Sequence, residues 1–105
     1  DGHFVQGHVD ATAICIKIEN QNGSWLYRFQ FDEQFAPLVI EKGSISINGI
    51  SLTVFDVART EFSVAIIPYT FEHTNIQFIQ MDSLVNIEFD ILGKYLHRYI
   101  ELKKI

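Results

Sequence analysis

Two short hydroxyl side chains, Ser51 and Thr53, are the first candidates for contacts with a polar ligand. They alternate with three apolar residues, Ile50, Leu52 and Val54. Because successive side chains of a β-strand point to opposite faces, the apolar set is expected to face a core and the hydroxyls to share the outer face. Such a pair can form a polar shelf for a ligand, although ordinary strand hydroxyls are the alternative interpretation.

The segment Gly2–Asp10, GHFVQGHVD, contains a second set of candidate residues. His8 has a side chain that titrates near neutral pH, which suits acid–base chemistry, and a surface histidine is the alternative. We predict a strand over His3–Val9 that Gly7 interrupts, and a strand glycine often marks close approach of a ligand. His3 and His8 would then face opposite sides of that strand, so we expect no shared metal site.

Two Asn-Gly pairs predict β-hairpins, because a type I′ turn needs positive φ at both central residues. Asn48-Gly49 joins Ser44–Ile47 to Ile50–Val54, with the second run continuing as far as Val57. Asn22-Gly23 joins the two other predicted strands Thr12–Glu19 and Trp25–Phe31.

The remaining pattern is mostly strand. Phe62–Ile67 is a predicted strand stopped by Pro68, which cannot donate to a ladder, and Leu84–Phe89 is the predicted last strand. Asp32 is a suitable cap for a helical turn over Phe35–Ile40. Tyr69–Asn75 is predicted to be a turn or one helical turn.

Only the end of the chain has a clear helical period. The apolar residues that form this stripe are Ile91, Leu92, Tyr95, Leu96, Tyr99 and Ile100. Asp90 is a suitable N-cap. We also expect four cations toward the C-terminal end of the helix, where the helix dipole favours positive charge: Lys94, Arg98, Lys103 and Lys104. About six evenly spaced strands before one helix predict an all-β fold, a small closed barrel of antiparallel strands.

Composition narrows the class of protein. The chain of 105 residues is long enough for one domain, and its 48% hydrophobic and 13% aromatic content excludes disorder. A net charge of −5 argues against a nucleic-acid groove, and no apolar run reaches the roughly 18 residues of a membrane span. The single cysteine, Cys15, suggests the reducing cytoplasm. Because the chain starts at Asp1 without a methionine, we expect it to be a fragment of a longer protein.

Four motifs in order carry a resemblance to a known family. They are GHFVQGHVD (Gly2–Asp10), KGSISINGISLTV (Lys42–Val54), IIPYTFEHT (Ile66–Thr74) and VNIEFDILGKYLHR (Val85–Arg98). In this order and spacing they resemble the C-terminal barrel of riboflavin synthase over almost the whole chain.

The resemblance implies a fold, an assembly and a reaction. Riboflavin synthases carry two six-stranded Greek-key barrels and a C-terminal helix through which they form homotrimers. Residues 1–90 would then be a lumazine-binding barrel and residues 91–105 an oligomerisation helix, with the N-terminal barrel absent. Each barrel binds one 6,7-dimethyl-8-ribityllumazine, and two such molecules dismutate to riboflavin and 5-amino-6-ribitylamino-pyrimidinedione between the N-terminal barrel of one subunit and the C-terminal barrel of a neighbour. No metal or separate cofactor is implied.

The resemblance also assigns site residues. Its candidate catalytic residues are His8, Ser51 and Asp90. Its candidate substrate-binding residues are Gly7, Val9, Ser44, Thr53, Ile67 and Thr70. Tyr69 stands where the family often has histidine, and we assign it no proton-transfer role.

Two other functions compete with the synthase. A non-catalytic lumazine or flavin carrier could use the same barrel and keep the same binding residues. An oligonucleotide-binding small barrel would need a basic, aromatic face, which the net charge of −5 disfavours.

Overall fold

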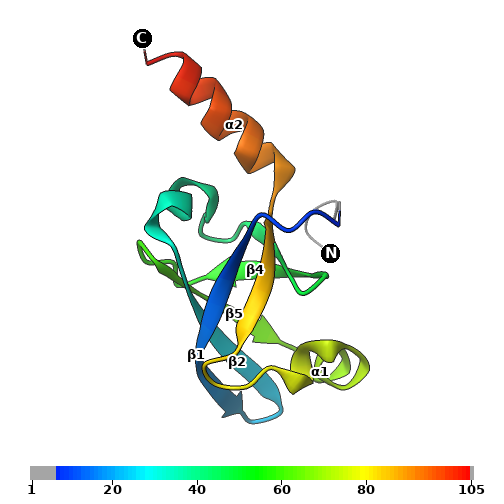
Figure 1. The fold of residues 1–105 in the computed structure, drawn as a ribbon. Coiled ribbons are helices and arrows are strands. Elements are labelled where there is room, and N and C mark those ends of the chain that lie inside the picture. The colour runs from blue at the N-terminus through cyan, green and yellow to red at the C-terminus, as the bar shows by residue number, and fades with distance from the viewer. Residues whose placement is uncertain (1–6, 105) are drawn as a thin grey trace.

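The computed structural model of the chain describes residues 7–104, and its strands close into one barrel (Figure 1). The strands are β1 (Ala11–Gln21), β2 (Ser24–Phe31), β3 (Ser44–Ile47), β4 (Ile50–Phe55), β5 (Glu61–Ile66) and β6 (Leu84–Phe89). Around the barrel they follow the order β1-β2-β5-β4-β3-β6, and every neighbouring pair is antiparallel. The predicted all-β, six-stranded antiparallel Greek-key barrel is therefore confirmed.

Both Asn-Gly turns form as predicted. Asn48 and Gly49 have φ of 48° and 87°, and Asn22 and Gly23 have φ of 62° and 109°. The first turn closes the pair Ile47↔Ile50, which puts Ser46 opposite Ser51 and Ser44 opposite Thr53. The turn chemistry thus fixes the register of the hydroxyl pair.

The predicted strand over His3–Val9 is wrong where it can be compared with the structure. Gly7–Val9 lie outside any strand, and β1 begins only at Ala11, while the rest of the segment, including His3, lies outside the described residues. Gly7 has a φ of +80°, which is incompatible with extended strand backbone. His8 therefore lies on no strand face, so the predicted placement of His3 and His8 on opposite faces of one strand does not hold.

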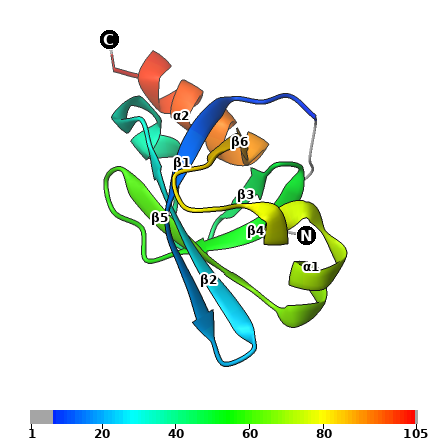
Figure 2. The ribbon, with the colours of Figure 1, turned by 60° about the horizontal axis from the view of Figure 1, so that its bottom comes forward.

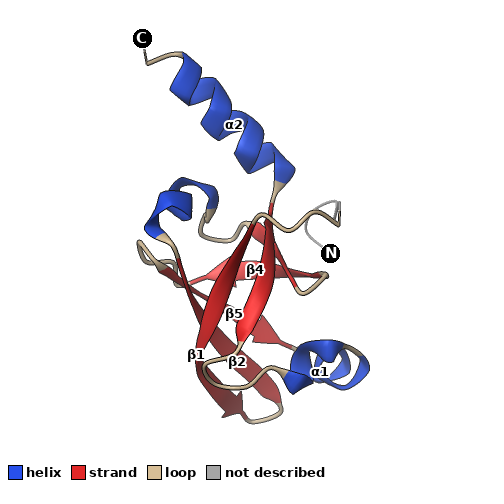
Figure 3. Cartoon of the chain, viewed as in Figure 1, coloured by secondary structure: helices blue, strands red, loops and turns tan. Residues whose placement is uncertain are grey.

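Other boundaries differ by a few residues. β4 ends at Phe55 rather than Val57, because Asp56 has a φ of 53° and turns the chain. Asp32 caps a 3₁₀ helix, η1 (Glu33–Leu38), instead of a turn over Phe35–Ile40. After β5 the chain forms α1 (Pro68–His73) and a second 3₁₀ helix, η2 (Asn75–Phe78), as the secondary-structure colours of Figure 3 make clear.

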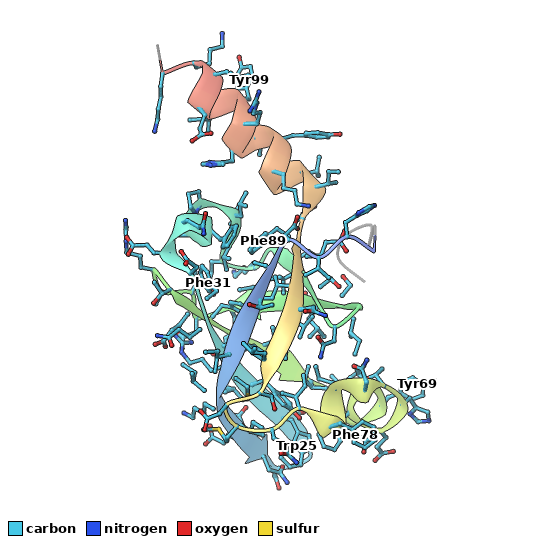
Figure 4. The ribbon with its side chains drawn as sticks, viewed as in Figure 1. Trp25, Phe31, Tyr69, Phe78, Phe89 and Tyr99 are labelled. Carbon is cyan, nitrogen blue, oxygen red and sulfur yellow. The ribbon has the colours of Figure 1, made fainter. Side chains whose placement is uncertain are left out.

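The barrel interior is filled largely by aromatic and branched side chains. Phe62 lies between Phe29 and Phe31, with ring centroids 5.6 and 5.8 Å away. Near the end of the barrel from which the last helix leaves, Phe89 packs on Phe35 of η1 at 5.3 Å (Figure 4). Cys15 is fully buried among these residues, as predicted for a small hydrophobic side chain.

The last helix, α2 (Ile91–Leu102), leaves the barrel and extends away from it (Figure 1). Asp90 caps it as predicted, because the carboxylate accepts the N–H of Leu92 at 3.2 Å. The helix has no buried residue, and most of its apolar stripe is exposed. Tyr99, labelled in Figure 4, lies far along the helix from the barrel.

A candidate ligand-binding cleft between β4 and β5

In the closed barrel, β4 and β5 pair over only part of their length. Their pairing covers Val54↔Val64 and Phe55↔Ser63, at the last two residues of β4 and in the middle of β5. Beyond Val54 toward Ile50, the two strands border a cavity of about 460 Å³. Ligand sites commonly measure about 300–1,000 Å³, so the opening is large enough for a small heterocycle. Residues from both strands and from α1 line it: Ile50, Ser51, Leu52, Thr53, Ala65, Ile66, Ile67, Thr70 and Thr74.

Backbone geometry turns the polar groups of Thr53 toward this cleft. The N–H of Val54 donates to Gly43 O at 2.8 Å, and its carbonyl accepts the N–H of Lys42 at 2.8 Å, so Val54 bonds toward β3. In an antiparallel strand the bonding direction alternates from residue to residue. Thr53 and Ser51 therefore direct their backbone N–H and C=O groups to the β5 side, while their side chains stand on the outer face of the sheet.

The side chains follow the predicted alternation with one difference. Val54 is buried and Thr53 is exposed, as expected, but Ile50 and Leu52 are only half-buried. These two residues line the cleft, where β5 no longer covers β4. On the opposite wall, Ala65 and Ile67 are exposed while Val64 and Ile66 are buried.

Helix α1 closes one end of the cleft and is anchored by aromatic contacts. Phe71 stacks on Trp25 of β2, with centroids 4.6 Å apart and planes 7° from parallel. Tyr27 donates its hydroxyl to Ile76 O at 3.2 Å, which holds η2 on the barrel. These contacts place Thr70 and Thr74 on the cleft, and Thr74 donates its hydroxyl to Thr70 O at 2.7 Å. Figure 2 shows α1 beside β4.

The exposed end of α1 carries a second aromatic stack. The ring of Tyr69 lies on that of His73 at a centroid distance of 4.1 Å, and His73 Nδ1 is 2.9 Å from Tyr69 O. Tyr69 is exposed and points away from the barrel (Figure 4). The cleft lining includes Thr70 but not Tyr69.

Four of the predicted site residues thus meet in this cleft: Ser51, Thr53, Ile67 and Thr70. Three others, Gly7, His8 and Val9, line a separate cavity of about 130 Å³ over β3 and β6. There the N–H of Gly7 donates to Glu88 Oε1 at 3.3 Å, and Glu88 is only 6% exposed. His8 and Val9 are exposed on the surface of this segment.

The last two predicted site residues, Ser44 and Asp90, line a third cavity of about 180 Å³ at the base of α2. Ser44 nevertheless faces Thr53 across the β3–β4 ladder. A parallel row joins Glu88, Ser46 and Ser51 through the pairs Ser46↔Glu88 and Ser46↔Ser51. The polar outer face is therefore continuous from β6 to β4, although its cavities are separate.

Sequence reasoning omitted Thr74, Ser46 and Glu88 from the site. Ser46 belongs to the same alternating hairpin as Ser51, so its position opposite that residue followed from the Asn-Gly turn. Glu88 and Thr74 carry no comparable local signal, because their placement depends on β6 pairing and on the packing of α1. Within residues 7–104, no cluster of three or more His, Cys, Asp or Glu side chains is arranged to hold a metal ion.

Glu41 organises the loop that follows β4. Its two carboxylate oxygens accept the N–H groups of Asp56 and Val57, both at 3.0 Å. These hydrogen bonds lower the pKa of Glu41 from its ordinary value of 4.5. The contact connects the chain just before β3 to the end of β4, and it therefore supports the strand that carries Thr53.

Comparison with known proteins identifies the family. A family model described as the lumazine binding domain matches residues 6–90. The chain belongs to this family. The lumazine-binding domain is 44% identical to the riboflavin synthase of Actinobacillus pleuropneumoniae over 98% of its length, covering 47% of that protein. It is 37% identical to the riboflavin synthase of Bacillus subtilis over 94% of its length, covering 46% of that protein. The predicted resemblance is confirmed, and the chain spans about half the length of these relatives.

Solved structures show the same barrel. A crystal structure of LumP complexed with 6,7-dimethyl-8-(1'-D-ribityl) lumazine superposes with a TM-score of 0.79 at 16% identity, over 84% of this chain and 50% of that one. LumP complexed with riboflavin gives a TM-score of 0.78 at 16% identity, over 85% of this chain and 48% of that one. At these identities the likeness concerns the fold alone.

None of the helices in residues 7–104 is long and apolar enough to cross a membrane.

Proposed function

We propose that this lumazine-binding domain is the C-terminal barrel of a riboflavin synthase, and that its β4–β5 cleft binds one 6,7-dimethyl-8-ribityllumazine. The observation that carries the proposal is the convergence of Ser51, Thr53, Ile67 and Thr70 on one cleft of about 460 Å³. The 44% identity to a riboflavin synthase supports it. In this proposal residues 1–90 form the barrel, residues 91–105 the assembly helix, and a second barrel precedes them in the full-length protein.

The cleft suits the edge of a flat, polar ring. A pterin-like heterocycle presents carbonyl and nitrogen acceptors along one edge, and the Thr53 backbone and hydroxyl provide donors on one wall. Ala65 and Ile67 provide a small apolar surface on the other wall. We expect the ring to lie between these walls, with the ribityl hydroxyls toward Thr70 on α1 and Thr74 just after it.

The reaction needs two lumazines and no external oxidant or reductant. The acidic C7 methyl group of one molecule loses a proton, the resulting carbanion attacks C7 of the second, and a four-carbon unit passes between them. Riboflavin and 5-amino-6-ribitylamino-pyrimidinedione then contain all the atoms of the two substrates. Holding both rings in reacting geometry is the main task of the protein, and such positioning can contribute about 7–11 kcal/mol.

A composite active site explains why the candidate residues are divided among three cavities. Gly7, His8 and Val9 do not line the β4–β5 cleft, and Asp90 lies at the base of α2. We assign these residues to contacts with the second lumazine or with the N-terminal barrel of a neighbouring subunit. In this composite site, the candidates for proton transfer, or for positioning the group that transfers the proton, are His8, Ser51 and Asp90.

Helix α2 is the proposed assembly element. Its exposed apolar residues are Leu92, Tyr95, Leu96, Tyr99, Ile100 and Leu102. An amphipathic helix with this much exposed apolar surface gains stability when a second helix covers it. We propose a homotrimer formed through this stripe.

The single thiol of Cys15 supports a location in the cytoplasm.

A carrier function is the competing proposal, since the LumP structures contain lumazine, riboflavin and flavin mononucleotide. The higher identity to riboflavin synthases, 33–44% against 16–21% for LumP, favours the enzyme. In a carrier, the same cleft would bind the ligand without conversion.

The test combines binding with turnover. The chain is titrated with 6,7-dimethyl-8-ribityllumazine while amide NMR shifts are recorded, and riboflavin formation is followed by absorbance. We expect shifts at Ser51–Thr53 and at 65–67, with little riboflavin from the isolated chain and robust formation once an N-terminal barrel is supplied. Binding without conversion in the full-length protein would favour the carrier, and shifts confined to β1 would contradict the proposed cleft.

A further inference from the structure

The carboxylate of Asp10 joins three parts of the molecule. Its Oδ2 accepts the N–H of Phe89, the last residue of β6, at 2.8 Å. The same oxygen lies 2.8 Å from Nζ of Lys94 in the first turns of α2. The Asp10 N–H donates to Ile87 O at 2.8 Å. One residue therefore connects the segment that carries Gly7–Val9, the end of β6 and the emerging helix.

This ion pair is better shielded from solvent than the other lysine–carboxylate pair among the described residues. The side chains of Lys94 and Asp10 are 26% and 24% exposed, whereas those of Lys17 and Glu19, 3.6 Å apart, are 57% and 49% exposed. Partly buried pairs are screened less by water and salt than exposed ones. Oδ2 of Asp10 also has a fixed backbone donor in Phe89, so its position does not depend on Lys94 alone.

Within residues 7–104, few other contacts fix the direction of α2. Only Asp90 separates the end of β6 from the start of the helix, and no residue of α2 is buried. The helix packs against η1, and a cavity of about 180 Å³ lies between Leu92 and Leu96 on one side and Leu38 and Ile40 on the other. Loose apolar contacts of this kind allow small changes in helix angle, whereas the Asp10–Lys94 pair opposes them.

We propose that the Asp10–Lys94 ion pair sets the angle at which α2 leaves the barrel and locks this angle to the Gly7–Val9 segment. Asp10 is then a positioning residue and not a catalytic one. A further consequence is that the pair aligns subunits and their shared active sites, and this consequence rests on the proposed function. The angle itself does not, because it is a property of the single chain.

The experiment follows the helix angle through a distance between labels on α1 and α2. Nitroxide labels are attached at Glu72→Cys on α1 and Arg98→Cys on α2, both at exposed positions, in a Cys15→Ala background. Labelled chain is diluted with unlabelled chain, so that distances within one chain dominate the electron–electron dipolar signal. Lys94→Met removes the cation, and Asp10→Asn keeps an oxygen for the Phe89 N–H while removing the charge.

We expect one narrow distance distribution in the parent chain and a broader or displaced one in both variants. Lys94→Arg should restore the parent distribution, and Lys17→Met, which removes the exposed pair, should leave it unchanged. Thermal unfolding followed by circular dichroism verifies that each chain is folded. If Lys94→Met does not fold, Asp10→Asn still tests the proposal. Distributions identical to the parent in the folded variants would overturn the proposal. The result is independent of whether the cleft binds a lumazine, which the NMR titration tests separately.

Discussion

Asn48 is held to Asn86 at two points. The backbone N–H of Asn48 donates to Asn86 O at 2.9 Å, and the Asn48 side-chain Oδ1 accepts the N–H of Asn86 at 2.8 Å. The turn residue thereby extends the pairing between the β3–β4 hairpin and β6. Because the same turn sets the register of Ser51 and Thr53, this contact fixes where the hydroxyls lie on the barrel.

Removing the Asn48 side chain should therefore destabilise the hairpin. Asn48→Ala leaves the Asn86 N–H without its side-chain acceptor and places alanine at a φ of 48°. We expect a loss of about 1–3 kcal/mol in the free energy of unfolding, measured in urea. Asn48→Asp keeps an acceptor and tolerates positive φ, so it should lose less. Equal losses in the two variants would show that Oδ1 is not important.

Phe71 is predicted to connect α1 to the ligand cleft. Phe71→Ala removes the ring that stacks on Trp25 at 4.6 Å, so Thr70 and Thr74 lose their support. Trp25 is the only tryptophan, and its fluorescence emission should shift to longer wavelength as water reaches it. Riboflavin affinity should fall about tenfold, equivalent to about 1.4 kcal/mol. Phe78→Ala, at an exposed position in η2, is the matched control and should change neither property.

Glu41 predicts a dependence of stability on pH. Its pKa in the folded chain is lowered from 4.5 by the hydrogen bonds from Val57 and Asp56. A lowered folded pKa means that the stabilisation is present above the unfolded value and is lost as pH falls through the folded value. The urea midpoint of the parent should exceed that of Glu41→Gln at pH 7, and the difference should shrink below about pH 4.5. A difference that does not change with pH would contradict this origin.

Cys15 should be unreactive in the folded chain. Burial raises the pKa of its thiol above the ordinary value of 9.0, so little thiolate is present and reagent has no access. At pH 8 we expect the disulfide reagent DTNB to react orders of magnitude more slowly with folded protein than with protein in urea. Similar rates in the two conditions would mean that the thiol is not buried in the barrel interior as described.

The sequence was most informative where local chemistry determines structure. The Asn48-Gly49 turn and the alternation after it predicted that Ser51 and Thr53 share a face, and Asp90 was recognised as the helix cap. The sequence was less informative where a contact between residues distant in the chain determines the local structure. Gly7–Val9 have a strand-like pattern but lie outside any strand, because Gly7 adopts positive φ and contacts Glu88, which is distant in sequence.

Lys94 illustrates the same limit. We placed it among cations that favour the C-terminal end of the helix dipole, yet it lies near the start of α2 and pairs with Asp10. The opening between β4 and β5 is another example. Each strand is regular by itself, and only the point at which the pairing stops, at Val54↔Val64, creates the cleft.

We propose that the β4–β5 cleft binds the lumazine through Thr53. The most direct test is an equilibrium titration with 6,7-dimethyl-8-ribityllumazine, followed by ligand fluorescence, for the parent, Thr53→Ala and Thr12→Ala. Thr12 is an exposed strand threonine that lies away from this cleft. We predict that Thr53→Ala weakens binding about tenfold, as loss of a hydrogen bond of roughly 1.4 kcal/mol requires, while Thr12→Ala binds like the parent. Unchanged affinity in folded Thr53→Ala, or equal loss in both variants, would contradict binding through Thr53.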